Sequence, residues 1–224
     1  MSKLPLKQTT AAFLLFFLLL TAGSRAFAHL PRLVGEEEVV EIKDPEVSQA
    51  FYGQLPGEPV LYEIYAREDF LLYVSLLVPD LPDIKTDISA LVTRINEVGE
   101  EHLSLLEGEK HPWEEFYEPF AGDHYLEGPE FEKEVPQGTY LIEVFSPQNT
   151  GKYVLSVGKQ EVFTPAETIH TLKTLPALKG DFFEKSPLTA FFNLIGLFIL
   201  IVLVLVVVPL YLLTRWGWKK FRQS

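Results

Sequence analysis

The sequence predicts a mainly β protein, in which an antiparallel β-sandwich or jelly-roll-like domain is followed by short helices and one C-terminal transmembrane helix. Three observations predict this class. Short alternating or apolar runs separated by turn residues fill the middle of the chain. A long uncharged apolar run lies near the C-terminus. The formal net charge of −12 over 224 residues is distributed very unevenly.

Residues 1–28 have the pattern of a signal peptide. Lys3 and Lys7 form a short basic region, and residues 11–22 form an apolar run that is too short to cross a bilayer. Ala26 and Ala28 give an A-x-A cleavage site. An uncleaved anchor is the alternative. In either case, we expect the chain that follows to be delivered across the membrane.

Residues 29–159 are predicted to form an extracytoplasmic sandwich domain. Turn residues at 67–69 and 146–151 predict two hairpins, each joining the strands on either side of the turn. The domain is long enough to bury a core without disulfides. The expected strands are 39–42, 60–66, 70–78, 88–95, 102–106, 139–145 and 152–157.

Residues 160–188 are predicted to form a helical juxtamembrane connector. Thr164 and Glu167 make a capping box around Pro165, so we expect a helix from Pro165 to about Lys173. The apolar residues of the connector would pack on the sandwich or lie at the membrane surface. They are Leu172, Leu175, Leu178, Phe182 and Phe183.

Residues 189–214 are uncharged and, as a helix, would be about 39 Å long, enough to cross a membrane with tilt. Asn193 and Gly196 lie on one face of this helix and are the candidate contact face for a partner helix. A position of Asn193 at the headgroup level is the alternative.

The last ten residues, 215–224, form a basic tail that we expect in the cytoplasm, since basic residues stay on that side. The protein would then be single-pass and type I in the cell membrane, with its N-terminal domain at the cell surface or in the periplasm. The predicted membrane-interface anchors are Trp216, Trp218, Lys219 and Lys220.

Composition excludes several functions. Residues 29–188 hold all 31 acidic residues and 12 basic ones, a net charge of −19, so the exported domain lacks the basic face of a nucleic-acid binder. The absence of cysteine excludes disulfides, thiolate metal sites and a cysteine nucleophile. No G-x-S-x-G, glycine-rich phosphate loop or S-x-x-K is present, and we therefore expect no enzymatic activity.

The segment 107–134 combines 10 acidic residues with six aromatic ones and is expected as a long loop. One interpretation is an interaction loop, because exposed aromatic rings supply contact area. The alternative is that the rings plug one end of the sandwich. The candidate interaction residues are Trp113, Phe116, Tyr117, Phe120 and Tyr125.

Calcium is a candidate cofactor, because hard cations bind clustered oxygen ligands on loops. Asp123, Glu127 and Glu130 lie together in a glycine-containing stretch of this segment. They match no spaced motif, and ordinary solvated carboxylates are the alternative. The expectation is therefore no cofactor, with calcium as a candidate.

The strand motifs GTYLIEV at 138–144 and GKYVLSVG at 151–158 resemble the last two strands of bacterial pre-peptidase C-terminal domains. PGEPVLY at 56–62, followed by DFLLYV at 69–74, is similar to the opening strands of those domains. The resemblance covers residues 38–158 and implies a small β-sandwich appended to an exported protein. The 107–135 insertion departs from that pattern.

The whole layout also resembles a group of prokaryotic membrane-anchored ectodomains, with LPRLV at 30–34 before the sandwich and LPALK at 175–179 before the span. The sequence thus predicts a non-enzymatic module, held on the lipid bilayer, that binds an extracytoplasmic protein or glycan. The alternative is an accessory structural subunit of a larger membrane complex, associating through its transmembrane helix.

Overall fold

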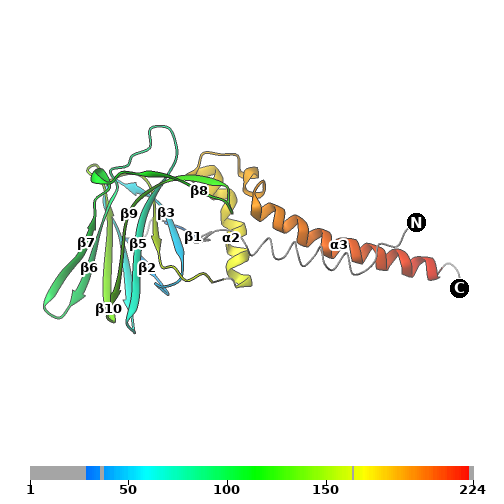
Figure 1. Ribbon diagram of the computed structural model, residues 1–224, viewed down its shortest axis with the longest axis horizontal. Helices are drawn as coiled ribbons and strands as arrows, with labels where there is room; N and C mark the ends of the chain where they lie inside the picture. The colour runs from blue at the N-terminus through cyan, green and yellow to red at the C-terminus, as the bar shows by residue number, and fades with distance from the viewer. Residues whose placement is uncertain (1–28, 36–37, 163, 222–224) are drawn as a thin grey trace.

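The computed structural model describes residues 29–35, 38–162 and 164–221, which form a two-layer β-sandwich with helices on one side (Figure 1). One layer is a six-stranded sheet of order β1-β3-β11-β5-β9-β8, and the other is a five-stranded sheet of order β2-β4-β10-β6-β7. The predicted mainly β class is therefore confirmed. The signal peptide predicted for residues 1–28 lies outside the described residues.

The strands follow one another along the chain with short connections. The six-stranded sheet contains β1 (Leu30–Leu33), β3 (Gln49–Pro56), β5 (Phe70–Pro79), β8 (Glu114–Glu118), β9 (Asp123–Val135) and β11 (Thr150–Val157). The five-stranded sheet contains β2 (Val39–Ile42), β4 (Val60–Ala66), β6 (Ser89–Asn96), β7 (Gly99–Leu106) and β10 (Gly138–Phe145).

Both predicted hairpins are wrong, although their strands are present. The strands β4 and β5 lie in different sheets, and so do β10 and β11. Instead, β4 pairs antiparallel with β10, and β5 pairs antiparallel with β11. A short turn between two apolar strands serves equally well to fold the chain back within a sheet or to carry it across the sandwich. The true hairpins are β6–β7 and β8–β9.

The sandwich is also not purely antiparallel, because β1 pairs with β3, and β2 with β4, in parallel. The sequence pattern does not predict strand β3, because its QAFYGQLP stretch contains a glycine and ends on a proline. The glycine is required by packing. A Cβ on Gly53 would lie 2.6 Å from the ring of Tyr153 on the neighbouring strand.

The core between the two sheets is built from alternate side chains of the central strands. At its centre, the hydroxyl groups of Tyr62 and Tyr153 are hydrogen-bonded at 2.8 Å, so neither buried oxygen lacks a partner. Burial raises the pKa of Tyr153 to about 12. Full burial of a side chain such as Leu72 or Leu155 contributes about 1.5–3 kcal/mol to folding.

The helices follow the sandwich in the order α2 (Pro165–Ala177), η2 (Leu178–Phe182), η3 (Pro187–Phe191) and α3 (Leu194–Phe221), while η1 (Gly108–Lys110) precedes β8. As predicted, the Thr164 side chain accepts a hydrogen bond from the Glu167 N–H at the start of α2. The connector packs on the outer face of the six-stranded sheet. There Leu178, Phe182 and Phe183 are buried with side chains of β3, β5, β9 and β11.

Helix α3 leaves the sandwich beside α2 and β8 (Figure 1). Residues Leu194–Tyr211 are long and apolar enough to cross a membrane, and none of this stretch is buried against the rest of the chain. The helix continues to Phe221, so the backbone of the predicted tail up to that residue is helical. Pro209 lies inside α3, near the end of the apolar stretch.

Candidate functional site

The 107–134 segment does not form the irregular loop that was expected. It folds into η1 and the β8–β9 hairpin, in which Phe116 pairs with Tyr125 across the strands. Phe116 and Tyr125 pack toward the connector, whereas Trp113 packs against the core. Trp113 also donates its indole N–H to the Gly108 carbonyl at 2.8 Å. Aromatic pairs of this kind stabilise neighbouring strands.

The turn of this hairpin, residues 118–123, is closed by Glu118. One carboxylate oxygen of Glu118 accepts the Phe120 N–H and the other accepts the Ala121 N–H, both at 2.7 Å. Its main-chain carbonyl accepts the Gly122 N–H at 2.9 Å. Gly122 has φ +71, a conformation that glycine adopts without strain. Burial raises the pKa of the Glu118 carboxyl. We call residues 118–123 the hairpin tip.

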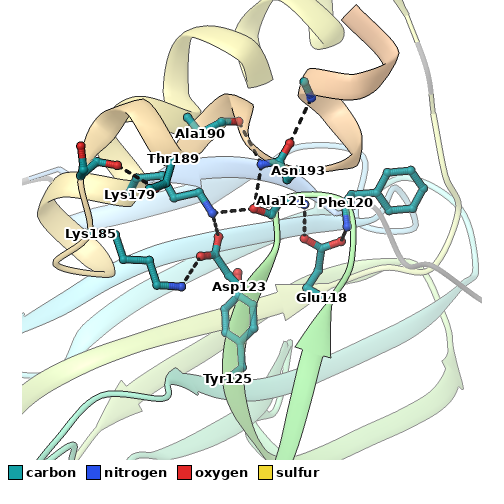
Figure 2. A network of polar contacts seen from close by, with 12 residues as sticks. Glu118, Phe120, Ala121, Asp123, Tyr125, Lys179, Lys185, Thr189, Ala190 and Asn193 are labelled. Atoms are coloured by element: carbon teal, nitrogen blue, oxygen red, sulfur yellow. Dashed lines mark hydrogen bonds and ion pairs between the residues drawn. The ribbon is translucent and has the colours of Figure 1, made fainter. Parts of the chain in front are cut away.

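A buried ion pair joins the hairpin tip to the connector (Figure 2). The carboxylate of Asp123 receives Lys179 at 2.6 Å and Lys185 at 3.0 Å. The side chains of Asp123 and Lys179 are each only 2% exposed. Lys179 also donates to the Ala121 carbonyl at 2.6 Å. A carboxylate and an ammonium can be buried together in this way because each satisfies the other.

The start of α3 is held by the same hairpin tip. The Asn193 side-chain amide donates to the Ala121 carbonyl at 2.8 Å, and its oxygen accepts the Gly196 N–H at 3.1 Å (Figure 2). The Ile195 N–H donates to the Phe120 carbonyl at 3.4 Å. An asparagine that satisfies a first-turn N–H stabilises a helix start. The turn between β8 and β9 therefore contacts the start of the apolar helix.

An aromatic cluster packs between the six-stranded sheet and the connector, next to the contacts of the hairpin tip. The hydroxyl groups of Tyr52 and Tyr125 are hydrogen-bonded at 2.9 Å, and burial raises the pKa of both. The rings of Phe182 and Phe183 approach Tyr52 and Tyr125 edge-on, with centroids about 5 Å apart. The connector is thus fixed by apolar as well as ionic contacts.

Arg32 on β1 and Glu167 on α2 form a second link, with two hydrogen bonds of 3.0 Å each. These bonds lower the pKa of the Glu167 carboxyl. A carboxyl group with a lowered pKa stabilises the fold above its unfolded-state pKa, and this contribution is lost as the pH falls through the folded-state value. Because both side chains are about a quarter exposed, the contribution is modest.

We therefore expect Glu167→Gln to lower the free energy of unfolding at pH 7 by about 0.5–1 kcal/mol. The difference from the wild type should decline as the pH falls below about 4.5, the ordinary value for this carboxyl. Urea unfolding of the full chain in detergent, followed by circular dichroism, measures it. Glu41→Gln is the control, because its pair with Lys43 is exposed. A pH-independent difference would contradict the assignment.

The structure separates the five predicted interaction residues. Tyr125 is buried, Trp113 and Phe116 are half-buried in the contacts described above, and Tyr117 and Phe120 are exposed. Tyr117 lies against the His124 ring across the hairpin. The set is thus not one continuous surface, and the exposed part is confined to the hairpin tip and its neighbour.

The structure also separates the three candidate calcium ligands. The Asp123 carboxylate faces two lysines, and Glu130 accepts a hydrogen bond from the Tyr73 hydroxyl at 3.0 Å. Burial, together with the neighbouring charge of Glu130, raises the pKa of the Glu127 carboxyl. Within residues 29–35, 38–162 and 164–221, no group of three or more histidine or acidic side chains is placed to hold a metal ion.

Among the predicted membrane-interface anchors, Trp218 is exposed near the end of α3. The side chains of Trp216, Lys219 and Lys220 lie outside the described residues, although their backbone belongs to the helix. The two residues of the predicted helix–helix contact face, Asn193 and Gly196, make contacts within the chain. A Cβ on Gly196 would lie 1.6 Å from the Phe191 carbonyl oxygen, so a glycine is needed there.

A surface that the sequence did not reveal is the outer face of the five-stranded sheet, which we call the open face. Side chains on alternate positions point outward, because their neighbours are buried between the sheets. One row crosses this face from edge to edge, each residue directly opposite the next. The row is Val39, Leu61, Glu143, Leu91 and Leu105.

Further apolar side chains flank this row. Leu141 points outward and pairs with Glu63 on the neighbouring strand. Tyr65 pairs with Thr139, and its side chain is 68% exposed. A sheet face toward water normally carries polar residues. The connector covers the outer face of the other sheet, whereas α2 contacts β1 and stands away from β6 and β7 (Figure 1).

No protein-family model and no curated protein matches the sequence. Similar solved structures include the pre-peptidase C-terminal domain of a collagenase from Bacillus anthracis, with 11% identity, coverage of 55% of this chain and 97% of that chain, and a TM-score of 0.35. A β-glucosidase from Paenibacillus barengoltzii has 12% identity, coverage of 61% of this chain and 14% of that chain, and a TM-score of 0.24. A pre-peptidase C-terminal domain, the family that the strand motifs resemble, is thus among the similar solved structures.

Proposed function

We propose that the chain is a single-pass, type I membrane protein whose exported sandwich is a non-enzymatic module that binds a protein partner through the open face. The observation that carries this proposal is the row from Val39 to Leu105, apolar except for Glu143. It crosses all five strands on a sheet face that, within the described residues, neither α2 nor α3 covers. Apolar side chains grouped on a solvent-facing sheet surface are typical of an interaction surface.

The charges on the open face indicate the chemistry of the partner. Glu41, Glu63 and Glu143 lie among the apolar side chains, and Lys43 is the basic neighbour of Glu41. Residues 29–188, which include these side chains, have a net charge of −19. A partner surface with apolar side chains bordered by lysine or arginine complements this face, because opposite charges steer association and select the partner. A protein fits this description better than a neutral glycan does.

The experiment is cross-linking of the intact protein in its native membrane, followed by purification and comparison of the cross-linked species. We compare the wild type with Leu91→Glu/Leu141→Glu, which places two charges in the open face without touching the core. Val98→Glu is the matched control, because Val98 is 99% exposed at the β6–β7 turn. All three proteins should have the same melting temperature.

We expect protein adducts with the wild type and the control, and their loss in the double variant. Identical adducts in all three proteins would overturn the open face as the contact surface. Binding to cell-wall glycan that depends on the open face, without a protein adduct, would replace protein by glycan as the class of ligand.

A further inference from the structure

We propose that the hairpin tip dips into the lipid headgroup region of the outer leaflet, next to the start of α3. The sandwich would then contact the bilayer at two places, the helix and the tip. The partner is the lipid surface itself, at the boundary between headgroups and acyl chains. This inference rests on the membrane-spanning role of α3 in the proposed function.

The hairpin tip lies beside the residues at which α3 begins. The Phe120 carbonyl accepts the Ile195 N–H, and Ile195 is the second residue of α3. Gly122 also lies beside Asn193, because a Cβ added at Gly122 would be 3.4 Å from the Asn193 Cβ. The apolar stretch begins at Leu194. When that stretch crosses a bilayer, the tip lies at the level where the helix enters it.

The surface around the start of α3 is apolar. Five large apolar side chains around the start of α3 are exposed, and we call them the apolar collar. Phe192 is 84% exposed and Leu188 is 72% exposed. Figure 2 shows the Phe120 ring pointing away from the Asp123–Lys179 pair. The collar consists of Phe120, Leu188, Phe191, Phe192 and Leu194.

Several backbone polar groups of the hairpin tip have hydrogen-bond partners within the chain. The tip has N–H donors at Phe120, Ala121 and Gly122, and Glu118 accepts all three. The Phe120 carbonyl accepts the Ile195 N–H, and the Ala121 carbonyl accepts hydrogen bonds from the Lys179 ammonium and the Asn193 amide. A backbone segment at the edge of hydrocarbon needs internal partners of this kind, because unsatisfied groups are costly there.

The charge distribution favours apolar over ionic contact with lipid. The Asp123 carboxylate is neutralised by Lys179 and Lys185 behind the tip. The domain as a whole is strongly acidic, so anionic headgroups would repel it. Phenylalanine and leucine side chains on an apolar face bury at the boundary between headgroups and acyl chains through apolar area, without needing lipid charge. We therefore choose a zwitterionic phosphatidylcholine bilayer as the probe.

The test uses the absence of cysteine, which allows one nitroxide label at a time on the full chain. Single cysteines are introduced as Phe120→Cys and Phe192→Cys in the collar, Val204→Cys in α3 and Val98→Cys at the far β6–β7 turn. Each protein is reconstituted in phosphatidylcholine vesicles. Collision of the label with oxygen, which concentrates in lipid, is compared with collision with a water-soluble nickel chelate.

We expect a several-fold higher oxygen-to-nickel ratio at 120 and 192 than at 98, and the highest ratio at 204. A label at 204 exposed to nickel would overturn the membrane span and the inference together. A lipid-exposed 204 with water-exposed 120 and 192 would overturn the tip contact alone. If 192 is in lipid and 120 is in water, the hairpin tip does not touch the bilayer, and the inference also fails.

Discussion

Asp123→Ala is expected to lower the free energy of unfolding by about 3–5 kcal/mol, because it removes one partner of a buried ion pair and leaves the other uncompensated. Lys179 is almost completely buried, and without Asp123 the acceptor left to it is the Ala121 carbonyl. The connector should separate from the hairpin tip before the sandwich unfolds. Denaturant unfolding of the full chain in detergent measures the loss, and limited proteolysis within 160–188 locates it.

Two further variants make this prediction specific. Lys185→Ala removes the more exposed of the two lysines and should cost less than about 1 kcal/mol. Asp123→Leu/Lys179→Met replaces both buried charges by apolar groups and should restore most of the stability. Equal losses for Asp123→Ala and Lys185→Ala would contradict the assigned role of the buried pair.

Gly196→Ala is expected to have the next largest effect, about 3 kcal/mol, because the new Cβ would overlap the Phe191 carbonyl oxygen. The turn before α3 must shift, and the contacts of Asn193 and Ile195 with the hairpin tip should be lost. Faster amide hydrogen exchange at 120–122 would report the release of the tip.

Gly180→Ala is the matched control for this substitution, since its Cβ would meet Pro187 at an ordinary distance of 3.4 Å. The comparison also separates two interpretations of Gly196. If Gly196 serves a helix–helix interface, the alanine variant changes self-association in detergent and leaves exchange at the tip unchanged. That outcome would contradict the intramolecular role and favour the accessory-subunit hypothesis.

Strands with a clear two-residue alternation could be predicted closely. The expected ranges 60–66 and 139–145 match β4 and β10 within one residue. Strand β9 was missed because its outward positions are acidic and its glycine and proline read as loop signals. A Cβ at Gly128 would lie 2.6 Å from the Trp113 ring, so this glycine serves packing within a strand rather than a turn.

The candidate site could be predicted only in part. The sequence indicates Asp123 as a candidate calcium ligand and Asn193 with Gly196 as a helix–helix contact face, but it does not indicate their partners within the chain. Asp123 meets Lys179, 56 residues further along the chain, and Asn193 reaches Ala121, 72 residues back. Residue type and spacing carry no information about such distant contacts, which depend on how the connector folds back over the six-stranded sheet.

The open face was missed for a different reason. In VLYEIYA at 60–66, apolar residues occupy outward as well as inward positions. The pattern indicates a strand, but it does not distinguish a covered outer face from an uncovered one. The six-stranded sheet has a similar outer face, and there the connector covers it. Only the arrangement of the helices identifies which face remains available to a partner.

The central claim is that the open face, rather than the 107–134 segment, contacts the protein partner. The most direct test places a benzophenone photo-cross-linker at Leu91 on the open face and, separately, at Tyr117, the exposed ring on β8. Both proteins are irradiated in the native membrane. We predict a protein adduct from position 91 and none from position 117. A protein adduct from position 117 with none from position 91 would contradict the claim.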